Sequence, residues 1–309
     1  MRGADASGIG CVTEVLQSAS EVPVPAPWPA SSPDEGALFA SWLHGRSVHT
    51  ARAYRANVAR FLAYVGAPLV AVTLADLQAY ADSLAAADLS PASRARMLAA
   101  VKSLFTFAHT TGYLPYNVGR GLRLPAVRAR LAERIPSEED VLTLLAHEPN
   151  RRNHALLRLL YTAGLRVSEA CALCWRDLQP RAEDGQVTVW GKGEKERAVL
   201  LTAGTWRELA AIRPAASRPE DPVFRSRHGR PVSVSQAWRI VKAAAARAGL
   251  EKADAFSPHW LRHAHASHAL DRGAPISLVR DGLGHASLVT TSRYTHARPG
   301  DGSSKYLPL

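Results

Sequence analysis

The apolar residues between positions 50 and 66 recur with the period of an α-helix. In "TARAYRANVARFLAYVG" they form one stripe, made of Tyr54, Val58, Phe61, Leu62 and Val65. Arg52 and Arg60 lie on the opposite side of the same helix. Because a stripe of this kind has to be buried against neighbouring helices, the stretch predicts an amphipathic helix with a basic outer face.

Two more segments extend this helical pattern. "TLADLQAYADSLAA" begins with Thr73 as a plausible N-cap, and "SPASRARMLAAVKSLFTFAHTTG" begins with Ser90 as N-cap and a proline at the first helical position. Arg96 and Lys102 fall outside the apolar stripe of the second segment. We therefore expect a small all-helical domain over residues 36–116, with a basic face.

The segments on either side of this domain have the composition of connections. Residues 1–35 include the Pro-rich run "PVPAPWPASSP", which predicts a disordered or extended arm. Residues 117–136 include "NVGRGLRLPAVRARLAERI", with five arginines, one acid, two glycines and a proline. This composition predicts a basic linker in which Arg123 lies along a phosphate backbone.

The second half of the chain is also mainly helical. Helix restarts at Ser137, is interrupted at Gly164, and returns from about Ser233 onward. Only Val187–Trp190 and Ala198–Leu201 alternate as strands do, across a turn rich in glycine and lysine. The predicted fold is mainly α, with an α-rich domain over 137–300 that carries a small antiparallel β-hairpin, followed by a tail over 301–309.

Size and composition limit the classes of protein. A chain of 309 residues accommodates two domains, and it contains no apolar run near 18 residues and no secretory signal. The three cysteines, Cys11, Cys171 and Cys174, are too few for a disulfide framework, which favours a reducing compartment. We expect a cytoplasmic protein without a membrane partner.

The charge favours a polyanionic partner. The chain has 38 Lys and Arg against 27 Asp and Glu, a net charge of +11. Such an excess is typical of nucleic-acid binding, although a basic surface that only confers solubility remains an alternative. The residues expected to contact a nucleic-acid backbone are Arg52, Arg60, Arg96, Lys102, Arg123 and Lys195.

A metal site is not expected. His259 and His263 are four residues apart, as are the histidine ligands of a zinc protease helix, but Trp260 replaces the glutamate of that motif. No cysteine or carboxylate cluster supplies further ligands, and the single CxxC of Cys171 and Cys174 lies in an apolar helix where packing is the simpler role.

Several side chains suited to phosphodiester chemistry occur in the second half. The candidate catalytic residues are Arg166, Lys192, His259, Arg262, His285 and Tyr294. Guanidinium groups neutralise nonbridging oxygens, imidazoles exchange protons near neutral pH, and an ammonium protonates a departing oxygen. A phenol becomes a nucleophile once its anion is stabilised. The set therefore predicts phosphodiester cleavage without a metal.

Four motifs in order, "TAGLRVSE", "WGKGEKER", "HWLRH" and "LGHASLVTTSRYTH", resemble those of the tyrosine recombinases, the phage integrase family, and most of all its compact Xer-like bacterial members. The resemblance spans residues 36–296 and implies a SAM-like core-binding domain followed by a catalytic domain. It implies that Arg166 and Arg262 clamp the phosphate, that Lys192 is the general acid, that His259 assists proton transfer and that His285 hydrogen-bonds the phosphate.

The resemblance assigns Tyr294 as the nucleophile, which attacks one DNA strand and leaves a 3′-phosphotyrosyl link and a free 5′-hydroxyl. Neither ATP nor a metal is implied, and four protomers would exchange strands between two specific double-stranded DNA sites through a Holliday junction. The alternatives are DNA relaxation by a type IB topoisomerase and a non-catalytic DNA-binding regulator on the same fold. The sequence departs from the family after Tyr294, where "ARPGDGSSKYLPL" leaves the coupling of protomers open.

Overall fold

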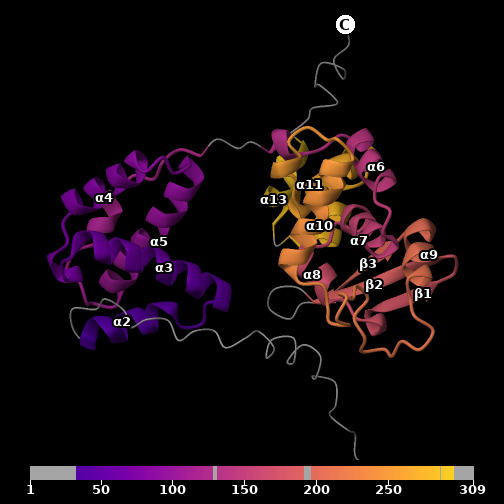
Figure 1. The fold of residues 1–309 in the computed structure, drawn as a ribbon. Coiled ribbons are helices and arrows are strands. Elements are labelled where there is room, and N and C mark those ends of the chain that lie inside the picture. Colours follow the sequence, from indigo (N-terminus) through magenta and orange to yellow (C-terminus); the bar gives the residue numbers. More distant parts are fainter. Residues whose placement is uncertain (1–32, 128–130, 191–195, 286, 296–309) are drawn as a thin grey trace, which may run out of the picture. The chain divides into compact units, whose positions relative to one another are not determined.

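The computed structural model describes residues 33–127, 131–190, 196–285 and 287–295 (Figure 1). The chain forms two compact units that divide between Ala129 and Arg130. Residues 1–32 of the arm expected over 1–35, the tail expected over 301–309, Lys192 and Lys195 lie outside the described residues. The expectations about them therefore stay predictions. Residues 33–35 form the first turn of a helix.

The first unit is a small helical domain. Its helices are α2 (Pro33–Leu43), α3 (Val48–Val65), α4 (Leu74–Ala86) and α5 (Pro91–Thr110), with a 3-10 turn η1 (Leu69–Ala71). Thr73 caps α4 in a reciprocal capping box with Asp76, and Ser90 caps α5, as the sequence predicts. The predicted stripe of α3 is confirmed for Val58, Phe61 and Leu62, which are buried.

The basic residues of this unit differ in their surroundings. Arg52, Arg60 and Arg96 are exposed. Lys102 instead donates from Nζ to the backbone carbonyl of Leu122 at 2.7 Å and to that of Arg120 at 3.4 Å. The beginning of the expected linker, which forms the 3-10 turn η2 (Val118–Gly121), is thereby fastened to α5.

The second unit places helices around a small sheet. The helices are α6 (Glu138–Ala146), α7 (Arg151–Thr162), α8 (Val167–Ala172), α9 (Ala203–Ala211), α10 (Val234–Arg247), α11 (Pro258–Asp271), α12 (Ile276–Leu283) and α13 (Leu288–Thr295). The 3-10 turns are η3 (Ala132–Arg134), η4 (Trp175–Asp177) and η5 (Ala253–Ala255). The prediction of a mainly α fold with an antiparallel hairpin is confirmed.

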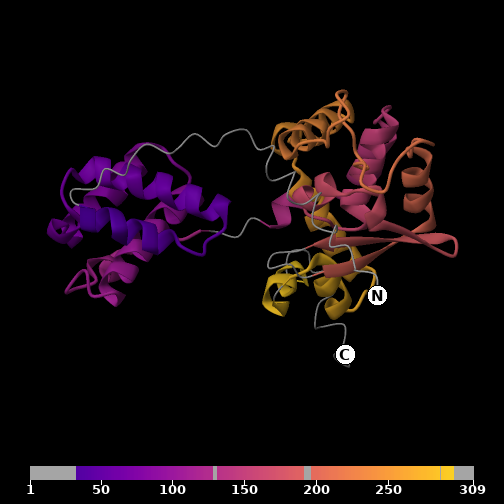
Figure 2. The same cartoon turned by 90° about the horizontal axis from the view of Figure 1, so that it is seen from below.

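The sheet has three antiparallel strands in the order β1 (Leu178–Arg181), β2 (Asp184–Trp190) and β3 (Glu196–Leu201). The sequence analysis missed β1, because "LQPR" contains a proline and lacks alternation. Trp190, at the end of β2, pairs with Glu196, at the start of β3. Figure 1 shows α9 against the sheet, and in Figure 2 the yellow C-terminal helices lie along one side of it.

A separate apolar cluster supports the C-terminal helices. It consists of Ile135, Ala266, Val279, Leu283 and Tyr294. Ile135 comes from the end of the expected linker, and the other members come from α11, α12 and α13, so this cluster fixes where α13 sits on α11 and α12. In the described residues, no helix is long and apolar enough to cross a membrane.

Candidate active site

Arg166 lies where α7 gives way to α8, next to a glycine that the backbone requires. Gly164 has a φ of +58°, and a Cβ atom at this position would lie 2.5 Å from Cδ2 of His265. The left-handed backbone ends α7 and turns the chain, so that Arg166 becomes the N-cap residue of α8.

Glu169 holds the side chain of Arg166. The backbone N–H of Arg166 donates to Oε2 of Glu169 at 2.8 Å, and its Nη1 donates to Oε1 at 2.7 Å. Arg197, on β3, donates to the same carboxylate through Nη1 and Nη2, at 2.9 and 2.7 Å. Burial raises the pKa of Glu169, but the hydrogen bonds from Arg197 and Arg166 outweigh it and leave the pKa below its ordinary value. The ionised carboxylate therefore fixes two guanidinium groups side by side.

Three consecutive backbone carbonyls at the C-terminal end of α12 each accept a hydrogen bond from a different arginine. The pairs are Arg197 Nε with Gly282 at 3.0 Å, Arg262 Nη2 with Leu283 at 2.6 Å, and Arg166 Nη2 with Gly284 at 3.1 Å. The last carbonyls of a helix lack intrahelical donors and lie at the negative end of its dipole, so they attract cations. The end of α12 thus gathers three positive charges from three other elements.

Arg262 is the most deeply buried of these arginines, at 5% exposure. Its Nη1 donates to the carbonyl of Gly164, which ties α11 to the junction of α7 and α8. Burial and the nearby Arg166 lower the pKa of Arg262 to about 10, so its guanidinium is still charged at neutral pH. Three guanidinium groups and the single carboxylate of Glu169 leave an excess of two positive charges, which suits an anionic phosphodiester.

His285 follows directly after these carbonyls. Gly284 adopts a φ of +63° and closes α12, and the N–H of His285 donates to the carbonyl of Arg280 at 3.1 Å. Nδ1 of His285 lies 3.0 Å from Oγ1 of Thr291, in α13. Partial burial, together with Arg262 and other arginines, lowers the pKa of His285 to about 4. The ring is therefore neutral at pH 7 and offers one donor and one acceptor.

His259 occupies the first turn of α11. This helix begins at Pro258, with Ser257 as its N-cap residue. The residue as a whole is exposed, but desolvation by the surrounding protein, Arg262 and Arg166 lower the pKa of its ring. The two arginines thus also influence the protonation of His259, at the exposed edge of the site.

Tyr294 is buried in α13, at 5% exposure. Its ring lies parallel to the ring of His285, with centroids 6.4 Å apart and an interplanar angle of 8°. Its Oη lies 2.8 Å from Nδ1 of His263. Burial, followed by the charges of His259 and Arg262, lowers the pKa of His263 to about 4, which keeps this imidazole neutral at pH 7.

The structure thus brings five of the six sequence-predicted catalytic residues into one region of the second unit, and Lys192 lies outside the described residues. Sequence reasoning missed Glu169 and Arg197, and it considered His263 only as a metal ligand. The spacing of Glu169 three residues after Arg166 is the signal of a capping box, and His263 shares the helix face of His259. Nothing in the sequence marks Arg197, because its partners are distant in the chain.

The two cysteines of the second unit lie in the protein interior, away from solvent. Cys171 and Cys174 are buried free thiols, and burial raises the pKa of Cys171 to about 12. Among the described residues, no group of three or more His, Cys, Asp or Glu side chains is arranged to hold a metal ion.

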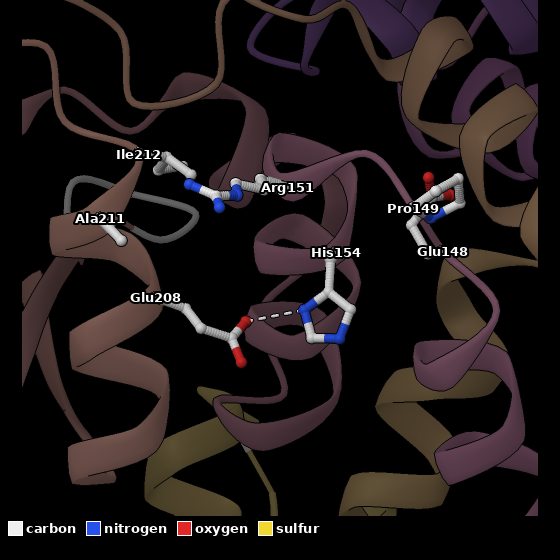
Figure 3. A pocket seen from close by; sticks show the side chains of 7 residues that line it. All are labelled: Glu148, Pro149, Arg151, His154, Glu208, Ala211 and Ile212. Carbon is white, nitrogen blue, oxygen red and sulfur yellow. Dashed lines mark hydrogen bonds and ion pairs between the residues drawn. The ribbon is translucent and has the colours of Figure 1, made fainter.

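A hollow on this unit lies between the start of α7 and the end of α9 (Figure 3). It is lined by Glu148, Pro149, Arg151, His154, Glu208, Ala211 and Ile212. Glu208 contacts His154 at 2.8 Å and Arg158 at 2.5 Å, so its charge is already matched within the protein. Of the candidate catalytic residues that the structure describes, none lines this hollow.

Two family models match the chain. The phage integrase family matches residues 137–300, and the N-terminal SAM-like domain of phage integrase matches residues 41–112. Among curated proteins, tyrosine recombinase XerC of Xylella fastidiosa (strain M23) is 35% identical over 272 residues, covering 84% of this chain and 90% of the relative. Tyrosine recombinase XerD of Vibrio vulnificus (strain YJ016) is 37% identical over 274 residues, covering 84% and 88%.

Solved structures share the fold. XerH site-specific recombinase bound to palindromic difH substrate, in a post-cleavage complex, has a TM-score of 0.67 at 22% identity, covering 81% of this chain and 77% of that one. A lambda integrase (75–356) dimer bound to a COC′ core site has a TM-score of 0.69 at 18% identity, covering 85% and 97%. At these identities the likeness concerns the fold.

Proposed function

This chain belongs to the phage integrase family and is a tyrosine recombinase, an enzyme of site-specific DNA recombination, and from this premise we propose which of its residues carry the reaction. The catalytic residues are Arg166, Lys192, His259, Arg262, His285 and Tyr294. The curated relatives favour neither the topoisomerase nor the non-catalytic alternative.

The observation that supports this assignment is the geometry at the end of α12. Arg166 and Arg262 both donate to its last carbonyls, His285 follows them directly, and the ring of Tyr294 stacks on that of His285 at 6.4 Å. A phosphodiester bound by the two guanidinium groups lies next to the imidazole and the phenol. Because carbonyls and Glu169 already hold the arginines, little reorganisation is needed when charge develops in the transition state.

In the proposed reaction, Oη of Tyr294 attacks the phosphorus atom and the 5′-oxygen departs. Arg166 and Arg262 stabilise the charge on the nonbridging oxygens, and the neutral ring of His285 donates one hydrogen bond to them. Lys192 protonates the departing oxygen, and His259 assists proton transfer at the exposed edge. The enzyme then holds a 3′-phosphotyrosyl link, which the free 5′-hydroxyl of a partner strand attacks to rejoin the DNA.

The partner in this proposal is double-stranded DNA with specific target sites. Related structures are described as a lambda integrase dimer on a core site and as XerH on difH DNA, which supports paired protomers on DNA, and we extend this to a tetramer that resolves a Holliday junction. The exposed Arg52, Arg60 and Arg96 contact the DNA backbone. We retain 36–116 and 137–300 as the domain limits and the cytoplasm as the compartment.

The experiment is a denaturing gel of covalent protein–DNA adducts. The DNA is a labelled duplex that carries the site the protein selects from random sequences, with a nick near the scissile phosphate that traps the intermediate. Tyr294→Phe should bind this duplex with unchanged affinity and salt dependence but form no detergent-resistant adduct, because the ring still packs and only the nucleophilic oxygen is lost.

His285→Ala should form the adduct slowly, because only a transition-state hydrogen bond is removed. An adduct that persists in Tyr294→Phe would falsify the assignment of the nucleophile. A two-site recombination assay on the wild-type protein separates strand exchange from simple DNA relaxation.

A further inference from the structure

The hydroxyl of the proposed nucleophile contacts an imidazole for which the sequence motifs imply no catalytic role. We propose that His263 is a catalytic residue of this chain, whose Nδ1 accepts the phenolic proton of Tyr294 as Oη attacks the phosphorus atom. The proposal rests on Tyr294 being the nucleophile. A general base has to lie within hydrogen-bond distance of the proton it removes, and the 2.8 Å between Nδ1 and Oη meets that requirement.

Helix packing fixes this contact. His263 lies on α11, and Ala266, less than one turn further along the same helix, shares the apolar cluster that buries the ring of Tyr294. The rings of His263 and Tyr294 are 5.6 Å apart, so the phenol is held both by its ring and by its hydroxyl. The ring of His259 lies one turn earlier on α11, 6.5 Å from that of His263. Of these two imidazoles, His263 is the one whose Nδ1 lies within hydrogen-bond distance of the phenolic oxygen.

The charges around His263 make it responsive to the substrate. The groups that face it are His259 and Arg262 on α11, Arg134 in η3, His285 after α12 and Tyr294 in α13. Without DNA, burial and the neighbouring positive charges keep the ring neutral, so Nδ1 accepts a hydrogen bond when the ring proton is on Nε2. A bound phosphodiester brings negative charge into the same cluster, which raises the basicity of the imidazole when the phenol has to lose its proton.

The proton balance closes without a co-reactant. The bond between Oη and phosphorus forms, the bond between phosphorus and the 5′-oxygen breaks, and the phenolic proton moves to Nδ1 of His263. Lys192 gives a proton to the departing 5′-oxygen. In the rejoining step each transfer runs backward, so that His263 returns its proton to Oη of Tyr294.

The test separates activation of the nucleophile from protonation of the leaving group. Single-turnover adduct formation is measured between pH 6 and pH 9.5 on the nicked duplex described above and on the same duplex with sulfur as the leaving atom. A thiolate departs without a proton, so sulfur should restore cleavage by Lys192→Ala. His263→Ala and His263→Asn should stay about 100-fold slow at pH 7 on both duplexes, and their rates should rise with pH.

The asparagine variant distinguishes a proton acceptor from a simple hydrogen-bond partner. Its amide oxygen can accept a hydrogen bond from the phenol but cannot take up the proton. Replacement of Tyr294 by the more acidic 3-fluorotyrosine should partly restore His263→Asn, because a phenol that loses its proton more readily needs less help. Cleavage by His263→Asn at the wild-type rate across the pH range would overturn the proposal.

Controls keep the two assignments apart. Adduct formation by Tyr294→Phe would contradict the assignment of the nucleophile. If Tyr294→Phe is inactive but His263→Asn forms the adduct at the wild-type rate, only the role of His263 is contradicted. His147→Asn is the matched substitution at an exposed histidine that ends α6, and it should cleave at the wild-type rate. Binding to the intact duplex and thermal unfolding check that the His263 variants fold, and the fluorotyrosine rescue reports on chemistry that a folding defect would not restore.

Discussion

Glu169 joins two arginines of the candidate active site through one carboxylate. Its side chain is 6% exposed and receives hydrogen bonds from Arg166 and Arg197. Without this negative charge the two guanidinium groups would repel one another, and the carboxylate that now separates them is itself almost fully buried. The arrangement of the two guanidinium groups thus depends on the carboxylate that both of them contact.

Glu169→Gln should destabilise the fold more at neutral pH than at low pH. The pKa of Glu169 lies below its ordinary value of 4.5 in the folded protein, so ionisation stabilises the fold above about pH 4.5 and this contribution is lost as pH falls through the folded pKa. We expect a loss of about 3 kcal/mol in the free energy of unfolding at pH 7, and a smaller difference from wild type below pH 4.5.

Denaturant titrations at a series of pH values measure this difference. Glu183→Gln, an exposed acid between β1 and β2, is the matched control and should change the free energy of unfolding by less than about 0.5 kcal/mol. A gap between Glu169→Gln and wild type that stays constant with pH would assign the loss to packing instead of charge.

Among the secondary-structure elements, the C-terminal end of α12 determines where the charged groups meet. The junction of α7 and α8, β3 and α11 are distant in sequence, yet each sends an arginine to one of its last carbonyls. Leu283 is fully buried beneath this end and Gly284 turns the chain, so the helix stops at a fixed place. In the "LGH" motif, Leu283 packs in the interior, Gly284 ends the helix and His285 is thereby placed next to the arginines.

Gly164→Ala tests the junction that faces this helix end. Both Gly164 and Gly249 have positive φ, +58° and +64°, but a Cβ atom meets the ring of His265 only at Gly164, whereas at Gly249 it meets nothing within 4 Å. Gly249→Ala should therefore cost about 1 kcal/mol from backbone strain alone.

Gly164→Ala should cost about 2 kcal/mol more than this, because the clash adds to the strain. It should also slow adduct formation, since the carbonyl of Gly164 accepts a hydrogen bond from Arg262. Chemical denaturation and the adduct gel measure the two effects, and equal losses of stability in both variants would show that the clash is relieved at no cost.

Over the whole molecule, the net charge of +11 is distributed between two units that each carry basic residues. Arg52 and Arg60 are exposed on α3, on the side opposite its buried stripe. Exposed arginines are suited to phosphate contacts, because each such contact releases counterions from the DNA. Lys102 contrasts with them, since its ammonium is bonded to two backbone carbonyls.

Replacing Arg52 and Arg60 together by alanine should weaken DNA binding to specific and random duplexes alike. The slope of log affinity against log salt concentration should become shallower by about 2, since two phosphate contacts are lost. Fluorescence anisotropy at several salt concentrations measures the slope. As a control, Lys102→Ala should mainly lower the thermal stability of the first unit. If the slope is unchanged in the variant that lacks Arg52 and Arg60, α3 does not contact the DNA backbone.

Features that depend on neighbours along the chain could be predicted from the sequence. Periodicity and capping act over a few residues. They therefore predicted the buried stripe of α3, the hairpin, and the N-caps Thr73 and Ser90. The motif order identified the family and five catalytic candidates that the structure brings together. The strand β1 was missed because its pairing with β2, and not its composition, makes it a strand.

Contacts between side chains that are distant in the sequence depend on how the elements pack, and no local pattern predicts them. Arg197 contacts Glu169 and the end of α12 only because β3 packs there. The first contact spans 28 positions of the sequence and the second spans 85, so no local pattern encodes them. In the same way, His263 appears in the sequence as half of a possible zinc pair, and the packing of α13 on α11 turns it into the partner of Tyr294. Local rules fix the elements, whereas the burial of their apolar faces fixes the distances between side chains on which the chemistry depends.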